Sequence, residues 1–165
     1  MNSILADYEA ERWRINAAGL AIVKRFEGWS AVPYHDPAGI STIGYGSTRT
    51  VDGQPITIDH PMITRAQGEE LLRAGLREAE EAVQRLIRVP LNPNEFSALT
   101  SFTYNVGSGN FHASTMRMKL NRCEYAAAAM EFPKWRRSGG MILAGLVRRR
   151  IAERALFLSH LTDLL

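Results

Sequence analysis

The sequence predicts a mainly α-helical α+β fold with a small β-rich lobe, a long connecting helix and a helical C-terminal lobe. Apolar residues recur at helical spacing before residue 27 and again from residue 64 onward. Between residues 31 and 59, glycine and proline divide the chain into short segments typical of strands and turns. The proline-free run from 64 to 88 predicts a helix on the order of 35 Å long at 1.5 Å per residue.

Length and composition are those of one ordinary globular domain. The chain has 165 residues, of which 45% are hydrophobic and 22% charged. A chain of this size can bury roughly 70% of its unfolded surface. We therefore expect a single domain over residues 1–165, whose parts follow in order: an N-terminal helical extension over 1–15, the small lobe over 16–63, the linking helix over 64–88 and the helical lobe over 92–165.

The elements before residue 64 are predicted from caps and breakers. A loose apolar stripe over residues 2–14 indicates a first helix. Asn16 can cap a second helix that runs through Glu27 and ends at Gly28. After it we expect short strands at 41–45 and 54–58, the second preceded by a hairpin turn at Val51-Asp52-Gly53-Gln54.

The later helices also have start signals. Thr64 with Gln67 forms a capping-box pattern ahead of the long helix, which should stop before Pro90. Asn92, Pro93 and Glu95 form a second start signal. Apolar spacing and the breakers between segments predict further helices over 114–120, 123–131 and 141–158.

Cysteine and histidine usage excludes a disulfide framework and a zinc site. Cys123 is the single cysteine, and no Cys/His cluster has metal-ligand spacing, so we expect neither a metal nor another cofactor. We expect Cys123 to be a small buried side chain. No apolar run is long enough to span a bilayer, and Ile15–Val23 reads as a core helix rather than as a signal peptide.

The basic residues gather near the C-terminus. The chain carries a net charge of +3, whereas residues 131–154 hold seven basic and two acidic residues, a net of +5. Such a field would attract an anionic partner. The favoured alternative is that Arg148, Arg149 and Arg150 form the solvated face of an amphipathic helix. Its core face would then hold Leu143, Leu146, Val147, Ile151, Ala155 and Leu158.

Two carboxyls and a hydroxyl near the second helix are the candidate catalytic groups. Glu27 lies between Phe26 and Trp29, where partial burial would favour its protonated form. Asp36 lies in a polar turn, where water and backbone donors would keep it ionised. One protonated and one ionised carboxyl form the pattern of glycoside hydrolysis.

The same residues also allow a plainer interpretation, because a Glu and an Asp nine residues apart occur in most soluble proteins. His35 adjoins Asp36 and could act as a base, but an exposed turn histidine is favoured. A serine nucleophile is excluded because no G-x-S-x-G elbow occurs.

The spacing resembles the catalytic motif of the phage-type lysozymes, glycoside hydrolase family 24. In that motif a helix ends in Glu-Gly, an Asp follows nine residues after the Glu, and a Thr that begins T-x-G-x-G follows fifteen residues after it. This sequence matches the motif without a gap at Glu27-Gly28, Asp36 and Thr42 to Gly46. The resemblance implies that Glu27 is the general acid, that Asp36 activates or positions water and that Thr42 holds this water from the other side. It also implies the two-lobed lysozyme-like fold.

A second, weaker match lies at Phe102 to Phe111, similar to the family's F-x-x-N-x-G block. By resemblance, Tyr45 in the first motif and Phe102, Asn105 and Gly107 in the second are the expected substrate-binding residues. The alternative for Gly107 is a helix C-cap in a left-handed conformation, and both roles can hold together.

The resemblance implies a phage endolysin, a monomer that hydrolyses the β-1,4 bond between N-acetylmuramic acid and N-acetylglucosamine with inversion. It would accumulate in the host cytoplasm and reach the peptidoglycan when a separate holin opens the membrane. We expect no nucleic-acid partner, and weak contact of the basic C-terminal helix with anionic membranes. The alternatives are a lytic transglycosylase that uses Glu27 alone and a non-catalytic wall-binding module.

Overall fold

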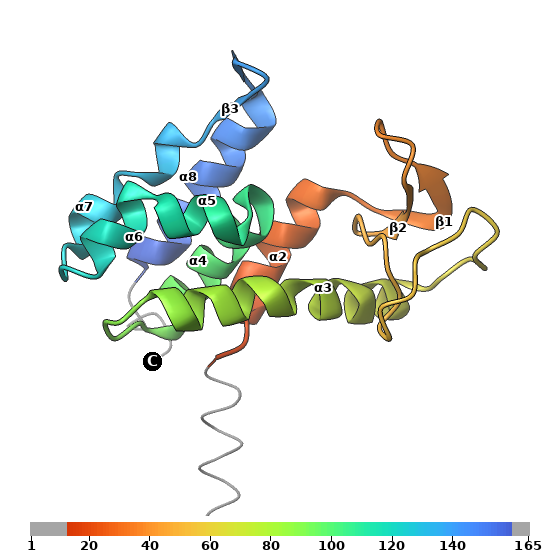
Figure 1. Ribbon diagram of the computed structural model, residues 1–165, viewed down its shortest axis with the longest axis horizontal. Coiled ribbons are helices and arrows are strands. Elements are labelled where there is room, and N and C mark those ends of the chain that lie inside the picture. The colour runs from red at the N-terminus through yellow and green to blue at the C-terminus, as the bar shows by residue number, and fades with distance from the viewer. Residues whose placement is uncertain (1–12, 160–165) are drawn as a thin grey trace, which may run out of the picture. The chain divides into compact units, whose positions relative to one another are not determined.

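The computed structural model describes residues 13–159, which divide into two compact units. One unit, here the β unit, comprises residues 24–77. The other, here the helical unit, comprises the described residues of 1–23 and 78–165. Helices α2 (Ala17–Glu27) and α3 (Arg65–Leu86) each continue from one unit into the other (Figure 1). The boundaries therefore fall inside these helices.

Helix α2 begins and ends where its breakers predict. The Asn16 side-chain oxygen accepts a hydrogen bond of 3.0 Å from the Gly19 amide, which confirms the cap. Gly28 follows the helix with φ +76°, a conformation that favours glycine. The helix predicted over 2–14 lies outside the described residues, apart from Trp13 and Arg14, which form a turn and a bend before α2.

The β unit contains one antiparallel hairpin. Strand β1 (Ser30–His35) pairs with β2 (Ser41–Gly44), with Tyr34 opposite Thr42 and His35 opposite Ser41. This confirms the strand predicted near 41–45. The turn at 51–54 is also confirmed, closed by a bond of 3.0 Å from the Gly53 amide to the Thr50 carbonyl. The strand predicted over 54–58 is reduced to an isolated bridge at Pro55, because proline has no amide proton for a ladder.

Helix α3 starts with the predicted capping box. The Gln67 side chain accepts from the Thr64 amide at 2.8 Å, and the Thr64 hydroxyl accepts from the Gln67 amide at 3.2 Å. Four apolar residues from β2, the segment between β2 and α3, and the start of α3 form a core cluster in the β unit, with Trp29 packed against them: Ile43, Ile56, Ile63 and Leu71. The first turns of α3 therefore contribute to the hydrophobic core of this unit.

The helical unit is built around α4 (Pro93–Val106), which begins with the predicted capping box of Asn92 and Glu95. Every residue from Phe96 to Thr103 is buried, so α4 is covered on all sides. Phe102 lies at its centre with edge-to-face contacts to Phe111, Phe132 and Trp135 at centroid distances of 6.2, 5.4 and 5.4 Å. The elements that follow are α5 (Ser108–Ala113), α6 (Thr115–Leu120), α7 (Tyr125–Ala129), the 3₁₀ turn η1 (Phe132–Lys134), β3 (Arg137–Ser138), β4 (Met141–Ile142) and α8 (Ala144–Leu158).

The predicted orientation of α8 was wrong at Arg149 and Arg150, whereas Arg148 is exposed as predicted. Arg149 and Arg150 are 2% and 0% exposed, whereas Ile151 and Leu158 are 60% and 45% exposed. The buried stripe of this helix is Arg149, Arg150, Glu153 and Phe157. The physical reason is that α8 packs on α4, which offers polar partners at this position.

The buried charges of α8 are neutralised together. The Glu153 carboxylate accepts from Ser101 Oγ at 2.7 Å and from Arg149 Nε at 3.1 Å, and Arg150 Nε lies 2.9 Å from its other oxygen. Burial raises the pKa of Glu153, and the two guanidiniums oppose this shift. The Arg150 guanidinium also lies over the Phe102 ring, 4.9 Å from its centroid. The arginine pair is thus part of the core.

Two smaller expectations also differ from the structure. Cys123 is exposed rather than buried, and its φ of +60° places it in the turn between α6 and α7. The helix predicted from 141 begins only at Ala144, because Gly139 and Gly140 close a short β3–β4 hairpin first. Within residues 13–159, no helix combines the length and apolar character needed to cross a bilayer.

The Glu153 cluster predicts a large stability effect. Glu153→Gln should lower the free energy of unfolding by about 3 kcal/mol or more, because two buried arginines lose their shared counter-charge. Chemical denaturation followed by circular dichroism measures this. Glu124→Gln is the matched control: it also removes an arginine partner, Arg122, but at an exposed site, and should leave stability nearly unchanged. Equal losses in both variants would contradict a structural role specific to the buried cluster.

Candidate active site

Glu27 is held beside the strand that carries the predicted hydroxyl. It is the last residue of α2 and is half-buried. A Cβ built on Gly46 would lie 3.7 Å from Oε2 of Glu27, and Gly46 itself has φ +89°. The carboxylate therefore approaches the backbone two residues after β2, at a position whose conformation favours glycine.

Trp29 fixes this approach. Its ring fills the space between β2 and α3, so that a Cβ on Gly68 would meet the ring at 2.3 and 2.8 Å, and one on Gly44 would meet it at 3.8 Å. The Gly44 position is also 3.4 Å from the Gly68 Cα. Gly44 and Gly68 thus allow β2, the Trp29 ring and α3 to pack in direct contact. Trp29 follows Glu27 by two residues, so this packing lies next to the candidate acid in the sequence.

Aromatic and charged side chains close around the same ring. Trp29 and Tyr45 stack at a tilted 54° with centroids 4.9 Å apart. The Arg65 guanidinium lies over the Trp29 ring, 4.5 Å from its centroid, and donates to the Tyr45 hydroxyl at 3.4 Å. These contacts join the first turn of α3 to the end of β2.

An ion-pair network ties α2 to α3 one turn before Glu27. The Lys24 ammonium donates to one oxygen of Glu69, and Arg73 donates to the other oxygen at 2.9 Å. The hydrogen bond from Lys24 and then that from Arg73 lower the pKa of Glu69. Lys24 also lies 5.6 Å from the Tyr45 ring centroid. The helix end that carries Glu27 is consequently anchored on both sides.

Asp36 sits in the turn between β1 and β2 and organises it. Its Oδ1 accepts hydrogen bonds of 2.8 Å from the amides of Ala38 and Ile40. Its own amide donates to the Ile40 carbonyl at 3.0 Å, and its carbonyl accepts from Gly39 at 2.9 Å. Both side-chain bonds use Oδ1, and among the described residues Oδ2 accepts no hydrogen bond. Oδ2 is therefore available to a water molecule.

Thr42 follows this turn and is 4% exposed. Its hydroxyl donates to the Ile40 carbonyl at 3.0 Å, which leaves the oxygen lone pairs to accept another hydrogen bond. Because side chains alternate along a strand and Tyr34 pairs with Thr42, Tyr34 and Thr42 share one face of the hairpin. Asp36 follows Tyr34 by two residues and begins the turn on this side.

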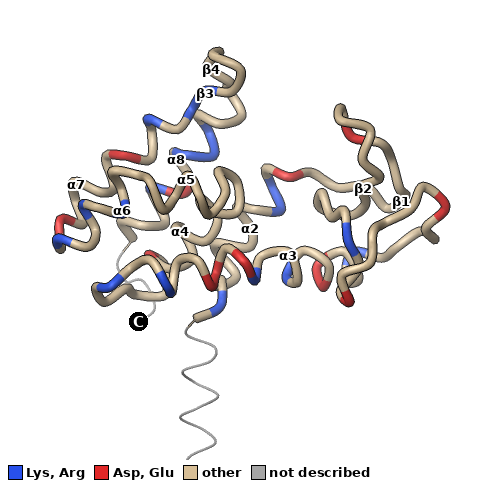
Figure 2. The backbone as a smooth tube through the Cα atoms, viewed as in Figure 1, with Lys and Arg blue, Asp and Glu red and all other residues tan. Residues whose placement is uncertain are grey.

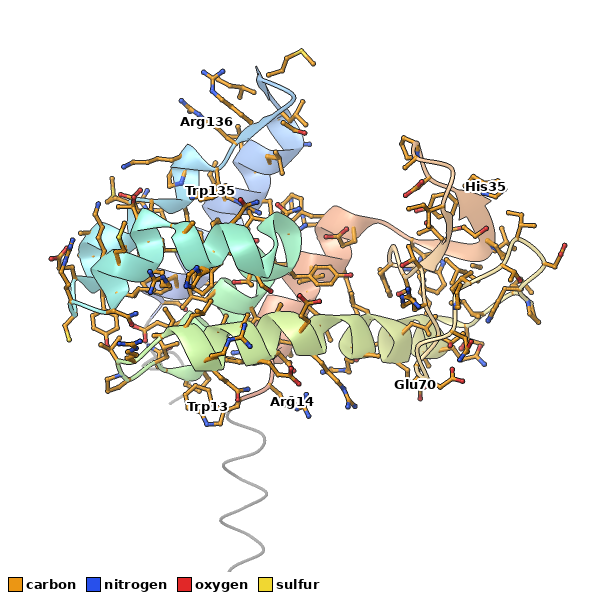
Figure 3. The ribbon with its side chains drawn as sticks, viewed as in Figure 1. Trp13, Arg14, His35, Glu70, Trp135 and Arg136 are labelled. Atoms are coloured by element: carbon orange, nitrogen blue, oxygen red, sulfur yellow. The ribbon has the colours of Figure 1, made fainter. Side chains whose placement is uncertain are left out.

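The structure brings four of the predicted site residues into one unit. Glu27, Asp36, Thr42 and Tyr45 all belong to the β unit. Tyr45 is 6% exposed, so most of its surface packs within the unit. His35 is exposed at the end of β1, as expected for a turn histidine (Figure 3).

The other three predicted site residues belong to the helical unit. Phe102 is fully buried and has no ring surface to offer a ligand. Asn105 is exposed, and its Oδ1 accepts a bond of 2.8 Å from Arg150 Nη2. Gly107 caps α4 through a 2.8 Å bond from its amide to the Thr103 carbonyl. Its φ of +89° with ψ of 148° is a glycine conformation but not the left-handed helical one.

Sequence reasoning missed Gly68 and Glu69 as parts of the site's support. The available signal was a glycine inside a long amphipathic helix, which usually marks close packing. Its partner, Trp29, is 39 residues away in sequence and cannot be inferred from helix periodicity. Within the described part of the chain, no group of three His, Cys, Asp or Glu residues could hold a metal ion.

Comparison with known proteins places this geometry in a family. A family model described as phage lysozyme matches residues 24–153. The endolysin of Salmonella phage P22 is 42% identical over 146 residues, which cover 88% of this chain and 99% of that protein.

Solved structures agree in fold. A crystal structure of the P22 lysozyme mutant L86M matches with a TM-score of 0.81 and 40% identity, covering 88% of this chain and 99% of that one. The muramidase domain of SpmX from Asticaccaulis excentricus matches with a TM-score of 0.77 and 33% identity, covering 89% of this chain and 99% of that one.

The Trp29 contact predicts a strong effect from one added methyl group. Gly68→Ala should destabilise the protein by about 2 kcal/mol, because the new Cβ collides with the indole ring. Lytic activity should fall with it, since Trp29 supports the Glu27 position. Thermal melting and a turbidity-clearing assay on permeabilised cells measure the two effects.

Gly145→Ala is the matched control, because Gly145 is also helical but has nothing within 4 Å of its Cβ position. It should raise stability by about 0.5–1 kcal/mol through helix propensity alone. If Gly68→Ala melts like the wild type, the packing account of the site is wrong.

Proposed function

The chain belongs to the phage lysozyme family and is a peptidoglycan hydrolase that serves host cell lysis, and we propose that it is a muramidase. Its reaction is hydrolysis of the β-1,4 bond between N-acetylmuramic acid and N-acetylglucosamine. The observation that carries this proposal is the Glu27 carboxylate beside Gly46, in the same compact unit as Asp36 and Thr42. The names lysozyme and muramidase, given to the P22 and SpmX structures, support it.

Glu27 is the proposed general acid. Its half-buried carboxyl donates a proton to the glycosidic oxygen as the bond to the muramic C1 breaks. The contacts of Trp29 and Lys24 support this role, because they hold the helix end on both sides of Glu27. A general acid needs such a fixed position, since proton transfer requires hydrogen-bond geometry.

Asp36 and Thr42 are the proposed water-holding pair. Oδ2 of Asp36 accepts a proton from the water that attacks C1, while Oδ1 stays bonded to the turn amides. The Thr42 oxygen accepts a hydrogen bond from the same water, its own proton being given to Ile40. Water then displaces the leaving sugar in one step with inversion, and solvent restores both carboxyls.

Further substrate contacts are proposed from the exposed residues. Asn105 offers its amide group to a sugar or stem peptide, oriented by Arg150. Gly107 shapes the chain at this point through its positive φ. Tyr45 and Phe102 are assigned to packing, because they are 6% and 0% exposed.

The remaining expectations concern the setting of the reaction. We propose one lysozyme-like domain that works as a monomer, without a metal, a cofactor or nucleic acid. We also propose that the protein accumulates in the host cytoplasm and reaches the wall through a separate holin. Membership of the phage lysozyme family is the support for this route.

Glu27→Gln should abolish lysis while the protein remains folded, because the amide is nearly isosteric but cannot donate the acid proton. Turbidity clearing of permeabilised Gram-negative cells measures activity, and thermal melting checks the fold. Glu70→Gln is the control: the same substitution at an exposed position of α3 in the same unit (Figure 3), where activity should be retained. A folded Glu27→Gln variant with full activity would remove Glu27 from the mechanism.

Asp36→Asn should reduce turnover by about 10²-fold or more, as expected for loss of a general base. The side-chain carbonyl of Asn can keep the bonds to the turn amides, so the hairpin should survive. Initial rates on purified sacculi measure this, with the exposed Asp59→Asn as control. A change below threefold would assign Asp36 a structural role and favour a transglycosylase, which needs only the acid.

A further inference from the structure

The β3–β4 hairpin and the start of α8 form an exposed surface in the helical unit. Every residue from 136 to 145 is exposed. Gly139 and Gly140 close the turn with φ of +54° and +80°, the backbone that a two-residue hairpin turn requires. In Figure 1 the hairpin projects past the first turn of α8. We call residues 136–148 the basic hairpin surface.

Three consecutive apolar side chains are exposed on this surface. Met141, Ile142 and Leu143 are 67%, 49% and 40% exposed, in consecutive positions. The hairpin is nevertheless ordered by its own bonds, from Arg137 to the Gly140 carbonyl at 2.9 Å and from the Leu143 amide to the Arg136 carbonyl at 3.0 Å. Three adjacent exposed apolar residues on a built hairpin indicate an interaction site rather than a frayed end.

The charge around this apolar tip is positive. Arg136, Arg137 and Arg148 are exposed, and residues 132–152 contain no acid. The flanking acids are already neutralised: Glu131 bonds Lys119 and Lys134, and Glu153 pairs with Arg149 and Arg150. Figure 2 shows the basic residues along this part of the chain, and the labelled Arg136 points away from the helices in Figure 3.

The side-chain types on the basic hairpin surface indicate which class of ligand it can bind. A side chain must accept a hydrogen bond to recognise the O–H group of a sugar or the N–H group of a stem peptide, and arginine has no acceptor. Residues 136–152 include no Asn, Gln, Asp, Glu or aromatic residue, and Ser138 is their one hydroxyl. An aliphatic tip flanked by arginines instead suits the interface of an anionic bilayer, where apolar groups enter the headgroup boundary and guanidiniums meet phosphates.

We propose that the basic hairpin surface binds anionic phospholipid bilayers. Met141 and Ile142 enter the headgroup boundary, and Arg136, Arg137 and Arg148 engage the phosphates. This location differs from the contact expected of the whole C-terminal helix, because two arginines of that helix are buried. The proposal uses none of the residues assigned to the chemistry, since Glu27, Asp36 and Thr42 belong to the β unit.

The test is co-sedimentation of the full chain with phosphatidylcholine vesicles, with and without phosphatidylglycerol. We expect binding to the anionic vesicles, weakened by added salt. Arg136→Gln with Arg137→Gln should weaken it about 25-fold, from roughly fivefold per arginine. Met141→Ser with Ile142→Ser should also weaken it, because the apolar tip is lost. Activity on purified sacculi should stay unchanged in both.

The matched control is Ile58→Ser with Met62→Ser, which removes two comparably exposed apolar residues, 46% and 73%, from the β unit. It should bind vesicles like the wild type. A Met141→Trp variant adds an independent readout: its extra fluorescence should shift to the blue with anionic vesicles.

Four results would overturn the proposal. Wild-type protein could bind both vesicle types equally or not at all. The control could lose as much binding as the hairpin variants. The hairpin variants could keep vesicle binding but lose affinity for purified sacculi, in which case the surface recognises the wall. Absence of a blue shift in Met141→Trp would contradict insertion of the tip.

Discussion

The contact of the Trp29 ring with Gly44 and Gly68 is the constraint on which the candidate site depends. A side chain at Gly68 would occupy the space of the indole, so the approach of β2 to α3 requires a residue without Cβ. Glu27 precedes this ring by two residues and reaches Gly46 just after β2. The proposed acid and the proposed water-holding pair belong to the same compact unit as this contact.

The core of the helical unit differs from that of the β unit because it contains charged side chains. Arg149, Arg150 and Glu153 are buried together on α8 and are satisfied partly by Ser101 of α4. A buried ion pair contributes little net stability but is costly to break. The same arrangement withdraws two arginines from the surface. Exposed positive charge in this segment is therefore carried by Arg136 and Arg137 of the hairpin and by Arg148 of α8, near an apolar tip.

Local signals in the sequence predicted much of this structure. The caps at Asn16, Thr64 and Asn92 were confirmed, because a capping bond joins residues three apart and needs no tertiary information. The turn at 51–54 and the strand at 41–44 were confirmed for similar reasons. The burial of Arg149 and Arg150 was not predictable from α8 alone. The apolar residues of α8 are spaced so that they could equally form the buried face of the helix. Only the polar partners on α4 decide that Arg149 and Arg150 are buried instead.

The candidate site remains a prediction, but the structure places its three catalytic candidates, Glu27, Asp36 and Thr42, in one unit. The packing that supports Glu27 could not be predicted, because the role of Gly68 depends on a ring far away in sequence. Phe102 shows the converse, since a motif match placed it at the substrate and its burial places it in the core. Motif spacing identifies candidate groups, and packing decides which of them have a free surface.

The central claim is that water, held by Asp36 and Thr42, attacks the sugar linkage that Glu27 protonates. Digestion of purified sacculi in ¹⁸O-labelled water, followed by mass spectrometry of the muropeptides, tests it directly. The account predicts one ¹⁸O atom at each new reducing N-acetylmuramic acid end. Products that end in anhydro-muramic acid without label would contradict it, because the muramic hydroxyl rather than water would then have closed the reaction.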